Sequence, residues 1–470
     1  MTVGGSGIAA VRALWMALFG LLIAALAFGP ALFLREPPAD EELLVISPHW
    51  DGIKREFGRA FTSRYLKDTG KHIRVVWLDV GNTGEIRKYL TERFAQAQPG
   101  AGIGADLLFG GGMDLLPDMA ARNYFEPYVL SPELAAELPA DLNGLELRDK
   151  QDRYHAACLS AFGFVYNKLV LKRAGLPAPR EWEDLGRPEF QGWVSSGDPT
   201  LSGSVHAAYE VVLQGQGWER GFSTLARMVS NVRAFNEGGS SVPRDVSLGQ
   251  AAVGPCIDFY ANAPIRRQGA THLQLVVPVR EGVVTADCAA ILRGPSHPAA
   301  ARAFMAFVLS EEGQRLWYQP RGTDGGPADY DLERLPVMPR IYELGLPTNT
   351  VLNPFKTLAA FKYDNKKGGA RWGVLNDLWR ATLIEAHEDL WNARRAVIAA
   401  GRDGDLGAAL VRAPFGEEAL LQVARKRLPP DERNALRNKW TAWARAWYRT
   451  IEAAAKTRGA VPEFQPGPLE

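Results

Sequence analysis

Short runs of serine, glycine and asparagine recur where a predicted strand gives way to a predicted helix. Four such junctions lie at residues 47–51, 81–84, 110–112 and 202–204. A helix N-terminus offers unpaired backbone N–H groups and the positive end of the helix dipole, so it favours an anion. Any helix entry uses these residue types, but four entries meeting at one edge of an α/β sheet indicate a ligand site.

The candidate ligand-binding residues are the polar and glycine residues of these junctions, together with residues at two later strand ends. Serine hydroxyls supply neutral donors, and glycine lets a ligand approach the backbone closely. His49 is suited to bind an anion, to ligate a metal or to close the cleft wall. The full set is Ser47, His49, Trp50, Asn82, Thr83, Gly110, Gly111, Gly112, Ser202, Gly203, Ser204, Ser240, Ser241, Asp258 and Tyr260.

No motif of a known catalytic or cofactor site accompanies these residues. The chain lacks the G-x-S-x-G, H-E-x-x-H and G-x-x-x-x-G-K-[ST] patterns. Residues 100–105 match a dinucleotide fingerprint but precede a strand instead of following one, so they are read as a loop. We therefore expect no cofactor and no enzyme activity, with a hydrolase as the less favoured alternative.

The elements that must position the candidates alternate between strand and helix. Apolar runs at 43–47, 73–80 and 106–109 predict strands, and residues 53–65 and 85–94 have helical spacing. This order is typical of a parallel sheet in an α/β domain.

A second α/β region follows, and then a helical tail. Residues 154–166 predict a strand crossing between lobes, and residues 273–279 predict the return crossing. The tail beyond residue 346 carries tryptophans at helical spacing, Trp440, Trp443 and Trp447, which we expect to pack onto the preceding lobe. Further expected elements are helices at 205–213, 218–229, 297–309 and 310–318 and a strand at 252–257.

The N-terminal residues predict export. Residues 14–34 carry no charge and are flanked by Arg12 and Arg35. At about 1.5 Å per residue this run matches a hydrocarbon core of about 30 Å, which favours an uncleaved anchor over a cleaved signal peptide. Arg12 before the run and acidic residues after it indicate that the rest of the chain lies outside the cytoplasm.

Charge and cysteine content narrow the class of protein. The net charge is +1, with 54 basic and 53 acidic residues, so no broad basic face indicates nucleic-acid binding. Cys158, Cys256 and Cys288 form no C-x-x-C pair, which excludes a zinc ribbon or thioredoxin motif. We expect three buried small side chains, with one disulfide as the alternative.

Several short strings occur in an order that resembles family 1 of the bacterial extracellular solute-binding proteins, in the branch with ferric-ion and organophosphate binders. The resemblance covers about residues 43–345. It rests on Ser-Pro-His-Trp at 47–50, Ala-Asp-Leu-Leu-Phe-Gly-Gly-Gly at 105–112, Phe-Val-Tyr-Asn-Lys at 164–168, Glu-Trp-Glu-Asp-Leu at 181–185, Asp-Pro-Thr-Leu-Ser-Gly-Ser at 198–204, Ile-Asp-Phe-Tyr at 257–260 and Phe-Val-Leu-Ser-Glu-Glu-Gly at 307–313.

The resemblance implies a type II periplasmic-binding fold, in which two α/β lobes joined by two strands close on a ligand. We expect a signal anchor at 1–36, lobe 1 at 43–150, lobe 2 at 151–275, the return to lobe 1 at 276–345 and a helical extension at 346–470. It also implies a periplasmic protein, anchored to the inner membrane or released if the signal is cleaved, that docks onto an ABC permease and its ATPase.

The resemblance leaves two kinds of ligand open. In ferric binders it implies two adjacent tyrosines, but residues 259–260 are Phe-Tyr here. A small anionic solute, a phosphate ester or an oxyanion, is therefore favoured, and ferric iron on His49, Asp258 and Tyr260 is the lesser alternative. A membrane-anchored sensor that signals through a partner is the alternative to an importer.

Overall fold

The computed structural model of this 470-residue chain describes residues 15, 16, 18, 19, 39–98, 100–112, 115–236, 238–269, 271–278, 282–348, 350, 352–357 and 363–469. In these ranges no helix is both long and apolar enough to cross a membrane. The predicted anchor at 14–34 lies mostly outside the described residues and stays a prediction.

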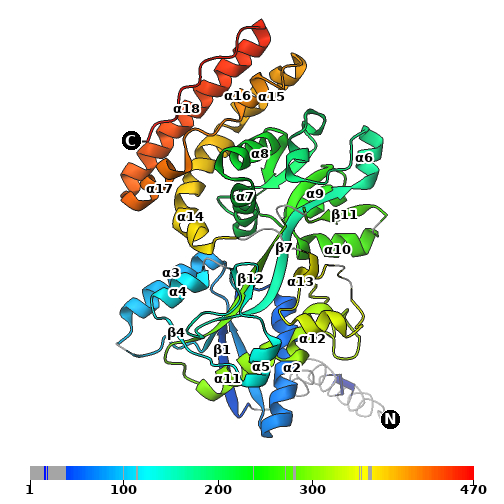
Figure 1. Ribbon diagram of the computed structural model, residues 1–470. Helices are drawn as coiled ribbons and strands as arrows, with labels where there is room; N and C mark the ends of the chain where they lie inside the picture. The colour runs from blue at the N-terminus through cyan, green and yellow to red at the C-terminus, as the bar shows by residue number, and fades with distance from the viewer. Residues whose placement is uncertain are drawn as a thin grey trace, which may run out of the picture.

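Ten strands of the described chain form one mixed sheet that runs through both halves of the molecule (Figure 1). The strand order is β2-β1-β3-β12-β7-β10-β8-β9, with β4 beside β12 and β11 beside β7. The first three pair in parallel, as their alternation with helices predicts. The strands are β1 (Glu41–Ile46), β2 (Ile73–Leu78), β3 (Leu107–Phe109), β4 (Phe125–Glu126), β7 (His155–Asn167), β8 (Val194–Gly197), β9 (Val232–Asn236), β10 (Val253–Ile257), β11 (Leu273–Val276) and β12 (Val283–Leu292).

Two long antiparallel strands, β7 and β12, cross between the lobes. Every residue of β7 is buried. Its first half contributes to the core of lobe 1 and its second half, from Phe162 on, to the core of lobe 2. The prediction of a crossing strand at 154–166 is confirmed by this path.

The predicted return crossing at 273–279 is wrong. Strand β11 pairs only with the lobe 2 end of β7, from Phe164 to Asn167, and the chain returns along β12. Both segments are apolar and β-rich, and hydrophobic pattern alone does not distinguish an edge strand from the strand that crosses. The second strand that crosses between the lobes is therefore β12.

Lobe 1 packs its helices against β1, β2 and β3. Ile53, Phe57, Phe61 and Tyr65 of α2 are buried, as their spacing predicts. Ser310 caps the helix that follows it, since its Oγ accepts from the N–H of Gly313. This lobe contains α2 (Asp51–Thr69), α3 (Thr83–Gln96), α4 (Leu115–Ala121), α5 (Pro132–Glu137), α11 (Pro298–Leu309), α12 (Glu311–Tyr318), a small hairpin of β5 (Asp141–Leu142) and β6 (Leu145–Glu146), and the 3-10 turn η3 (Pro339–Glu343).

Lobe 2 surrounds β8, β9 and β10 with helices. The helical runs predicted at 205–213 and 218–229 are confirmed as α7 and α8, which are longer by one to three residues at most ends. The elements are α6 (Lys168–Ala174), η1 (Trp182–Gly186), η2 (Pro188–Phe190), α7 (Gly203–Gln216), α8 (Trp218–Ser230), α9 (Ser241–Ser247) and α10 (Asp258–Gln268).

The tail is helical and completes the core of lobe 2 (Figure 1). Trp379 and Trp440 are fully buried in the same cluster as Tyr209 and Leu213 of α7. From residue 363 on, the tail thus packs onto lobe 2, whereas Leu352 and Phe355 at its start still pack against the core of lobe 1. It comprises α13 (Pro354–Thr357), α14 (Asn365–Trp379), the π-helical turn η4 (Arg380–Ile384), α15 (His387–Ala399), α16 (Leu406–Leu410), α17 (Glu417–Lys426) and α18 (Pro430–Thr457).

The three cysteines are free thiols buried in strands of the sheet. Cys158 lies on β7, Cys256 on β10 and Cys288 on β12. They act as small core side chains, and the alternative of a disulfide is not realised among them.

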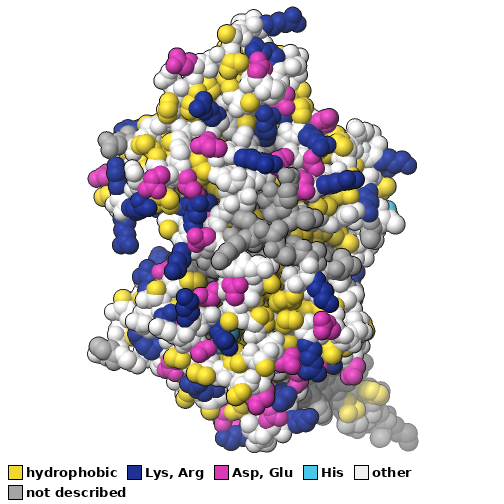
Figure 2. Space-filling view, in the orientation of Figure 1, with side chains coloured by type: hydrophobic (Ala, Val, Ile, Leu, Met, Phe, Trp, Pro, Cys, Tyr) yellow, Lys and Arg dark blue, Asp and Glu magenta, His cyan; other side chains and the backbone are white. Residues whose placement is uncertain are grey.

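The charged surface agrees with the small net charge. On the face shown in Figure 2, acidic and basic side chains are intermingled over both lobes and the tail. No single-sign patch dominates this face.

Gly163 on β7 lies where the two lobes meet, and we predict that replacing it by alanine destabilises the protein. A Cβ at this position would lie 2.0 Å from the carbonyl oxygen of Val276 on β11. Relieving the clash requires a backbone shift, which costs roughly 1–3 kcal/mol. Chemical denaturation should show a lower midpoint for Gly163→Ala.

The matched control is Gly373→Ala on α14. A Cβ there meets only the Arg433 guanidinium, at 3.8 Å. Alanine favours a helix interior over glycine by roughly 0.5–1 kcal/mol, so this variant should be slightly more stable than the wild type. Equal midpoints for the wild type and Gly163→Ala would contradict the close packing of β7 against β11.

Candidate functional site

A cavity of about 380 Å³ lies between the two lobes. Its lining comes from the β1–α2 junction and the start of α3 in lobe 1, and from the starts of α7, α9 and α10 in lobe 2. The predicted residues that line it are His49, Asn82, Thr83, Gly111, Gly112, Ser202, Gly203, Ser204, Ser240 and Tyr260.

The N-terminus of α7 opens onto the cavity without a side-chain cap. Ser202 occupies the N-cap position, yet its hydroxyl accepts from the N–H of Gly239 and contacts the Ser204 hydroxyl at 3.2 Å. The first N–H groups of the helix are therefore not satisfied by Ser202, and they lie beside two hydroxyls that line the cavity. This arrangement suits an anion.

The N-terminus of α3 faces the same cavity but is already capped. The Asn82 Oδ1 accepts from the N–H groups of Gly84 and Glu85, and the Glu85 carboxylate accepts from the Asn82 N–H. This capping box satisfies the donors that an anion would otherwise use. Asn82 and Thr83 thus line the cavity with side chains and leave fewer free N–H groups than α7 does.

His49 presents two unused ring nitrogens at the lobe 1 side of the cavity. The residue is 6% exposed, and neither ring nitrogen has a hydrogen-bond partner among the described residues. Its Nε2 lies 3.8 Å from the Asp287 carboxylate. Burial lowers the pKa of His49, against the opposing effect of Asp287, so the ring is neutral near pH 7.

Arg334 and Asp287 form an ion pair that sequence reasoning missed. The Nη1 group of Arg334 donates to Asp287 Oδ2 and to Ser160 Oγ, both at 2.8 Å, and the guanidinium carbon lies 3.5 Å from the centre of the Phe259 ring. Its buried Nε has no partner among the described residues. Burial raises the pKa of Asp287, but opposing effects, of which the charge of Arg334 is the largest, together outweigh burial and lower it to about 2.

Five predicted residues do not line the cavity, namely Ser47, Trp50, Gly110, Ser241 and Asp258. The Ser47 hydroxyl accepts from the His49 N–H, and a Cβ on Gly110 would lie 2.6 Å from the His49 ring. Ser241 begins α9 directly after Ser240.

Trp50 and Asp258 also differ from their predicted roles. Trp50 is 46% exposed and contacts the Tyr330 ring edge-on at 5.4 Å. The Asp258 carboxylate is buried and accepts from the N–H groups of Ala161 and Phe259, so it fixes the start of α10 against β7. Trp50 is therefore a surface side chain and Asp258 a structural one.

Residues missed by the sequence reasoning complete the lining. Asp287 and Thr285 lie within β12, Arg334 lies in an irregular segment, Phe259 lies in the first turn of α10, and Tyr363 and Trp372 come from the helical tail. Of these residues, only Phe259 follows a strand-to-helix junction, which was the signal used. The missed polar and aromatic lining residues are Thr285, Asp287, Arg334, Phe259, Tyr363 and Trp372.

The iron alternative has little support from this geometry. In the described ranges no group of three or more His, Cys, Asp or Glu side chains is gathered to hold a metal ion. Both oxygens of Asp258 already accept from backbone N–H groups, and Tyr260 is the single phenol of the Phe-Tyr pair at the cavity.

Comparison with known proteins confirms the resemblance to solute-binding proteins. Residues 104–327 match the family described as bacterial extracellular solute-binding protein. The phosphoglycerate transport regulatory protein PgtC of Salmonella typhimurium is 30% identical over 178 residues, which cover 38% of this chain and 44% of that protein. This chain thus spans less than half the length of that curated relative.

Solved structures show the same two-lobed fold. The periplasmic binding protein AfuA from Actinobacillus pleuropneumoniae, with fructose-6-phosphate bound, has a TM-score of 0.58 at 19% identity over 73% of this chain and 99% of its own. The apo ferric ion-binding protein A of Pasteurella haemolytica has a TM-score of 0.54 at 16% identity over 72% and 96%. At these identities the similarity establishes the fold alone. Both of these solved structures are of binding proteins.

Asp258 should make stability depend on pH. Burial raises its pKa to about 7 despite the hydrogen bonds from Ala161 and Phe259. A carboxyl whose pKa is higher in the folded state than in the unfolded state stabilises the fold while it is protonated. This contribution is fully present below the unfolded pKa, near 4, and is lost as the pH rises through the folded pKa of about 7. Relative to Asp258→Asn, which carries no charge, the wild type should lose a few degrees of Tm between pH 4 and 8.

Differential scanning fluorimetry at stepped pH measures this difference. Asp51→Asn is the control, because the Asp51 side chain is 84% exposed and its replacement should not change the slope. Parallel Tm curves for the wild type and Asp258→Asn would mean that Asp258 stays ionised in the fold.

Proposed function

We propose that this protein is the extracytoplasmic solute-binding component of an ABC importer and that it captures a small anionic solute, a phosphate ester or an oxyanion, between its lobes. The observation that carries the proposal is the set of unused donors at the cavity. The uncapped start of α7 supplies donors from lobe 2. His49 supplies a ring nitrogen from lobe 1, and Arg334 supplies guanidinium N–H groups beside β12, between the lobes.

An anion suits these donors better than a cation does. Asp287 balances the charge of Arg334, so the ligand meets an ion pair, hydroxyls and helix-end N–H groups instead of bare charges. The positive end of the α7 dipole disfavours a cation at this position. Arg334 also covers Phe259, at the place where a second iron-binding phenol would be required.

The mechanism is capture by closure about β7 and β12. Donors on both lobes contact one ligand only when the lobes approach each other. A ligand that binds the closed state more tightly shifts the population toward it by that difference in affinity. The closed form is then the shape that a permease and its ATPase recognise, and the apolar run at residues 14–34 would keep the protein at the membrane.

Anion binding is tested by a thermal-shift screen and calorimetry on the chain from Asp40 onward. Probes are inorganic phosphate, glycerol 3-phosphate, glucose 6-phosphate, a phosphonate and ferric citrate. A ligand at 100 times its Kd stabilises the folded state by about 2.7 kcal/mol, which gives a visible shift. We expect a shift with phosphate compounds and none with ferric citrate.

A matched pair of serine variants locates the site. Ser204→Ala removes one hydroxyl at the cavity and should weaken binding about 5–10-fold, as the loss of one hydrogen bond does. Ser247→Ala, at the far end of α9, should bind like the wild type. A shift with ferric citrate alone would reverse the choice of ligand, and equal effects of both variants would place the site elsewhere.

Closure is tested separately by small-angle scattering with and without the ligand found. The radius of gyration should fall when ligand is added, because the lobes approach each other about β7 and β12. An unchanged radius with saturating ligand would contradict the clamp while leaving the binding site intact.

A further inference from the structure

The helical tail contributes directly to the cavity. Tyr363, Gly369 and Trp372, at and near the start of α14, line it together with the residues of the two lobes. The tail is therefore not only a cover for the core of lobe 2. The geometry gives it a surface that a bound ligand would contact.

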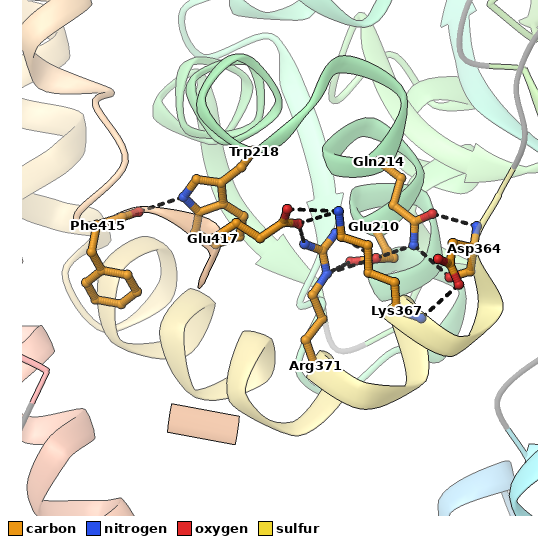
Figure 3. Close-up of polar contacts among 8 residues, drawn as sticks. All are labelled: Glu210, Gln214, Trp218, Asp364, Lys367, Arg371, Phe415 and Glu417. Carbon is orange, nitrogen blue, oxygen red and sulfur yellow. Dashed lines mark hydrogen bonds and ion pairs between the residues drawn. The ribbon is translucent and has the colours of Figure 1, made fainter. Parts of the chain in front are cut away.

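A buried ion pair fixes this part of the tail to α7 (Figure 3). Arg371 and Glu210 are both 0% exposed, and the Arg371 Nε and Nη2 groups donate to the Glu210 carboxylate at 2.8–3.2 Å. Arg371 also contacts Glu417 of α17, which Lys367 reaches at 2.7 Å. Removing one partner of such a buried pair costs several kcal/mol, so α14 is held firmly on α7.

Two further contacts fix the start of α14. Gln214 of α7 accepts from the Asp364 N–H at 2.7 Å and donates to the Asp364 carbonyl at 3.1 Å (Figure 3). Asp364 in turn caps α14 by accepting from the Lys367 N–H. The residues on either side, Tyr363 and Gly369, therefore keep a defined position at the cavity.

Trp372 is held flat against α7 close to the anion-binding end of that helix. Its ring stacks on the His206 ring, with centres 3.4 Å apart and planes 15° apart. The His206 Nδ1 group contacts Asn376 Oδ1 at 2.7 Å, and burial lowers the pKa of His206 to about 3, so the stack is uncharged. His206 lies one turn beyond Ser202, a distance of about 6 Å along the helix.

We propose that residues 363–372 form a second subsite that selects anionic esters with a sizeable organic part over bare oxyanions. The anionic group lies at the start of α7, and the carbon skeleton extends over about one helical turn to contact Trp372. The cargo class is a phosphate ester of a ring-shaped or several-carbon alcohol. This inference rests on the proposed anion-binding function and adds the determinant of ligand size.

The size and chemistry of the cavity support this class. A volume of about 380 Å³ falls in the range for sites of small organic ligands, about 300–1,000 Å³. Polar donors gather at α7, His49 and Arg334, while the tail wall offers aromatic faces. An aromatic wall stabilises an organic ring through apolar burial and contributes nothing to a bare phosphate ion.

Gly369 allows the subsite to be blocked without disturbing the fold. Gly369 lines the cavity and no atom lies within 4 Å of a Cβ built on it, so Gly369→Leu adds a bulky side chain at the cavity wall without a clash at its Cβ. The matched control is Gly373→Leu, one turn further along the same helix and outside the cavity lining. Leucine favours the helix at both positions, so both variants should fold.

The measured quantity is the ratio of Kd for inorganic phosphate to Kd for glucose 6-phosphate, from calorimetry on the folded chain. In the wild type we expect the ester to bind at least tenfold more tightly. Gly369→Leu should reduce this ratio at least tenfold with the Kd for phosphate unchanged, and Gly373→Leu should preserve it. An unchanged ratio in Gly369→Leu, or a wild type with no preference for the ester, would overturn the subsite.

Variants of Trp372 provide a second, independent test of the subsite through the same ratio of Kd values. Trp372→Ala should lower the ratio and Trp372→Phe should restore most of it, since the flat ring is kept. An equal loss for both ligands would show that Trp372 only supports the fold and would contradict the inference. A wild type that binds neither ligand would refute the proposed anion-binding function itself, which distinguishes that failure from failure of the subsite alone.

Discussion

The pairing of β7 with β12 is the constraint on which both lobes depend. These antiparallel strands share a register from His155 with Ala289 to Phe162 with Val283, and one bulge interrupts it near Asp287. Because each strand contributes side chains to both cores, the two hydrophobic cores are linked through the same pair of strands. The lobes can change their angle by twisting these strands, but the hydrogen-bonded ladder keeps the floor of the cavity between them in place.

The bulge lies beside an ion pair on the floor of the cavity. Asp287 lies at the irregular register step and accepts from Arg334, which also donates to Ser160 on the opposite strand. Burial of either charge alone would be costly, and the pair compensates for this only through close geometry. The pair leaves other guanidinium donors and the neutral His49 ring unused, so the site is organised before a ligand arrives. Ser47 and Gly110, which were expected to contact ligand, hold and accommodate that ring instead.

Sequence patterns over a few neighbouring residues predicted those parts of the candidate site that lie at strand-to-helix junctions. The Ser202–Ser204 and residue 110–112 junctions were found because the end of a strand followed by glycine and serine has a recognisable spacing, and the helices behind them were found from their 3.6-residue period. Asp287 and Arg334 lie in a strand interior and in an irregular segment, and what brings them together is strand register and a long return of the chain. The same limit explains why β11 was taken for the crossing strand and why Trp372 was not among the candidate residues. Contacts between residues such as Glu210 and Arg371, 161 positions apart, leave no short-range pattern in a single sequence.

The shared core of lobe 2 and the tail has a consequence for the order of folding. Trp218 of α8 donates to the carbonyl of Phe415, 197 residues later, and Trp440 and Ile451 of the last helix belong to the same core. At about 5–20 residues per second, ribosomal synthesis of that interval takes roughly ten to forty seconds. During this time lobe 2 lacks part of its interior, and Glu210 lacks its partner Arg371. Lobe 1 also awaits β12, so the chain stays without a finished lobe until late in synthesis. A secretion machinery that transports unfolded chains would therefore bind this protein before either lobe could complete its fold.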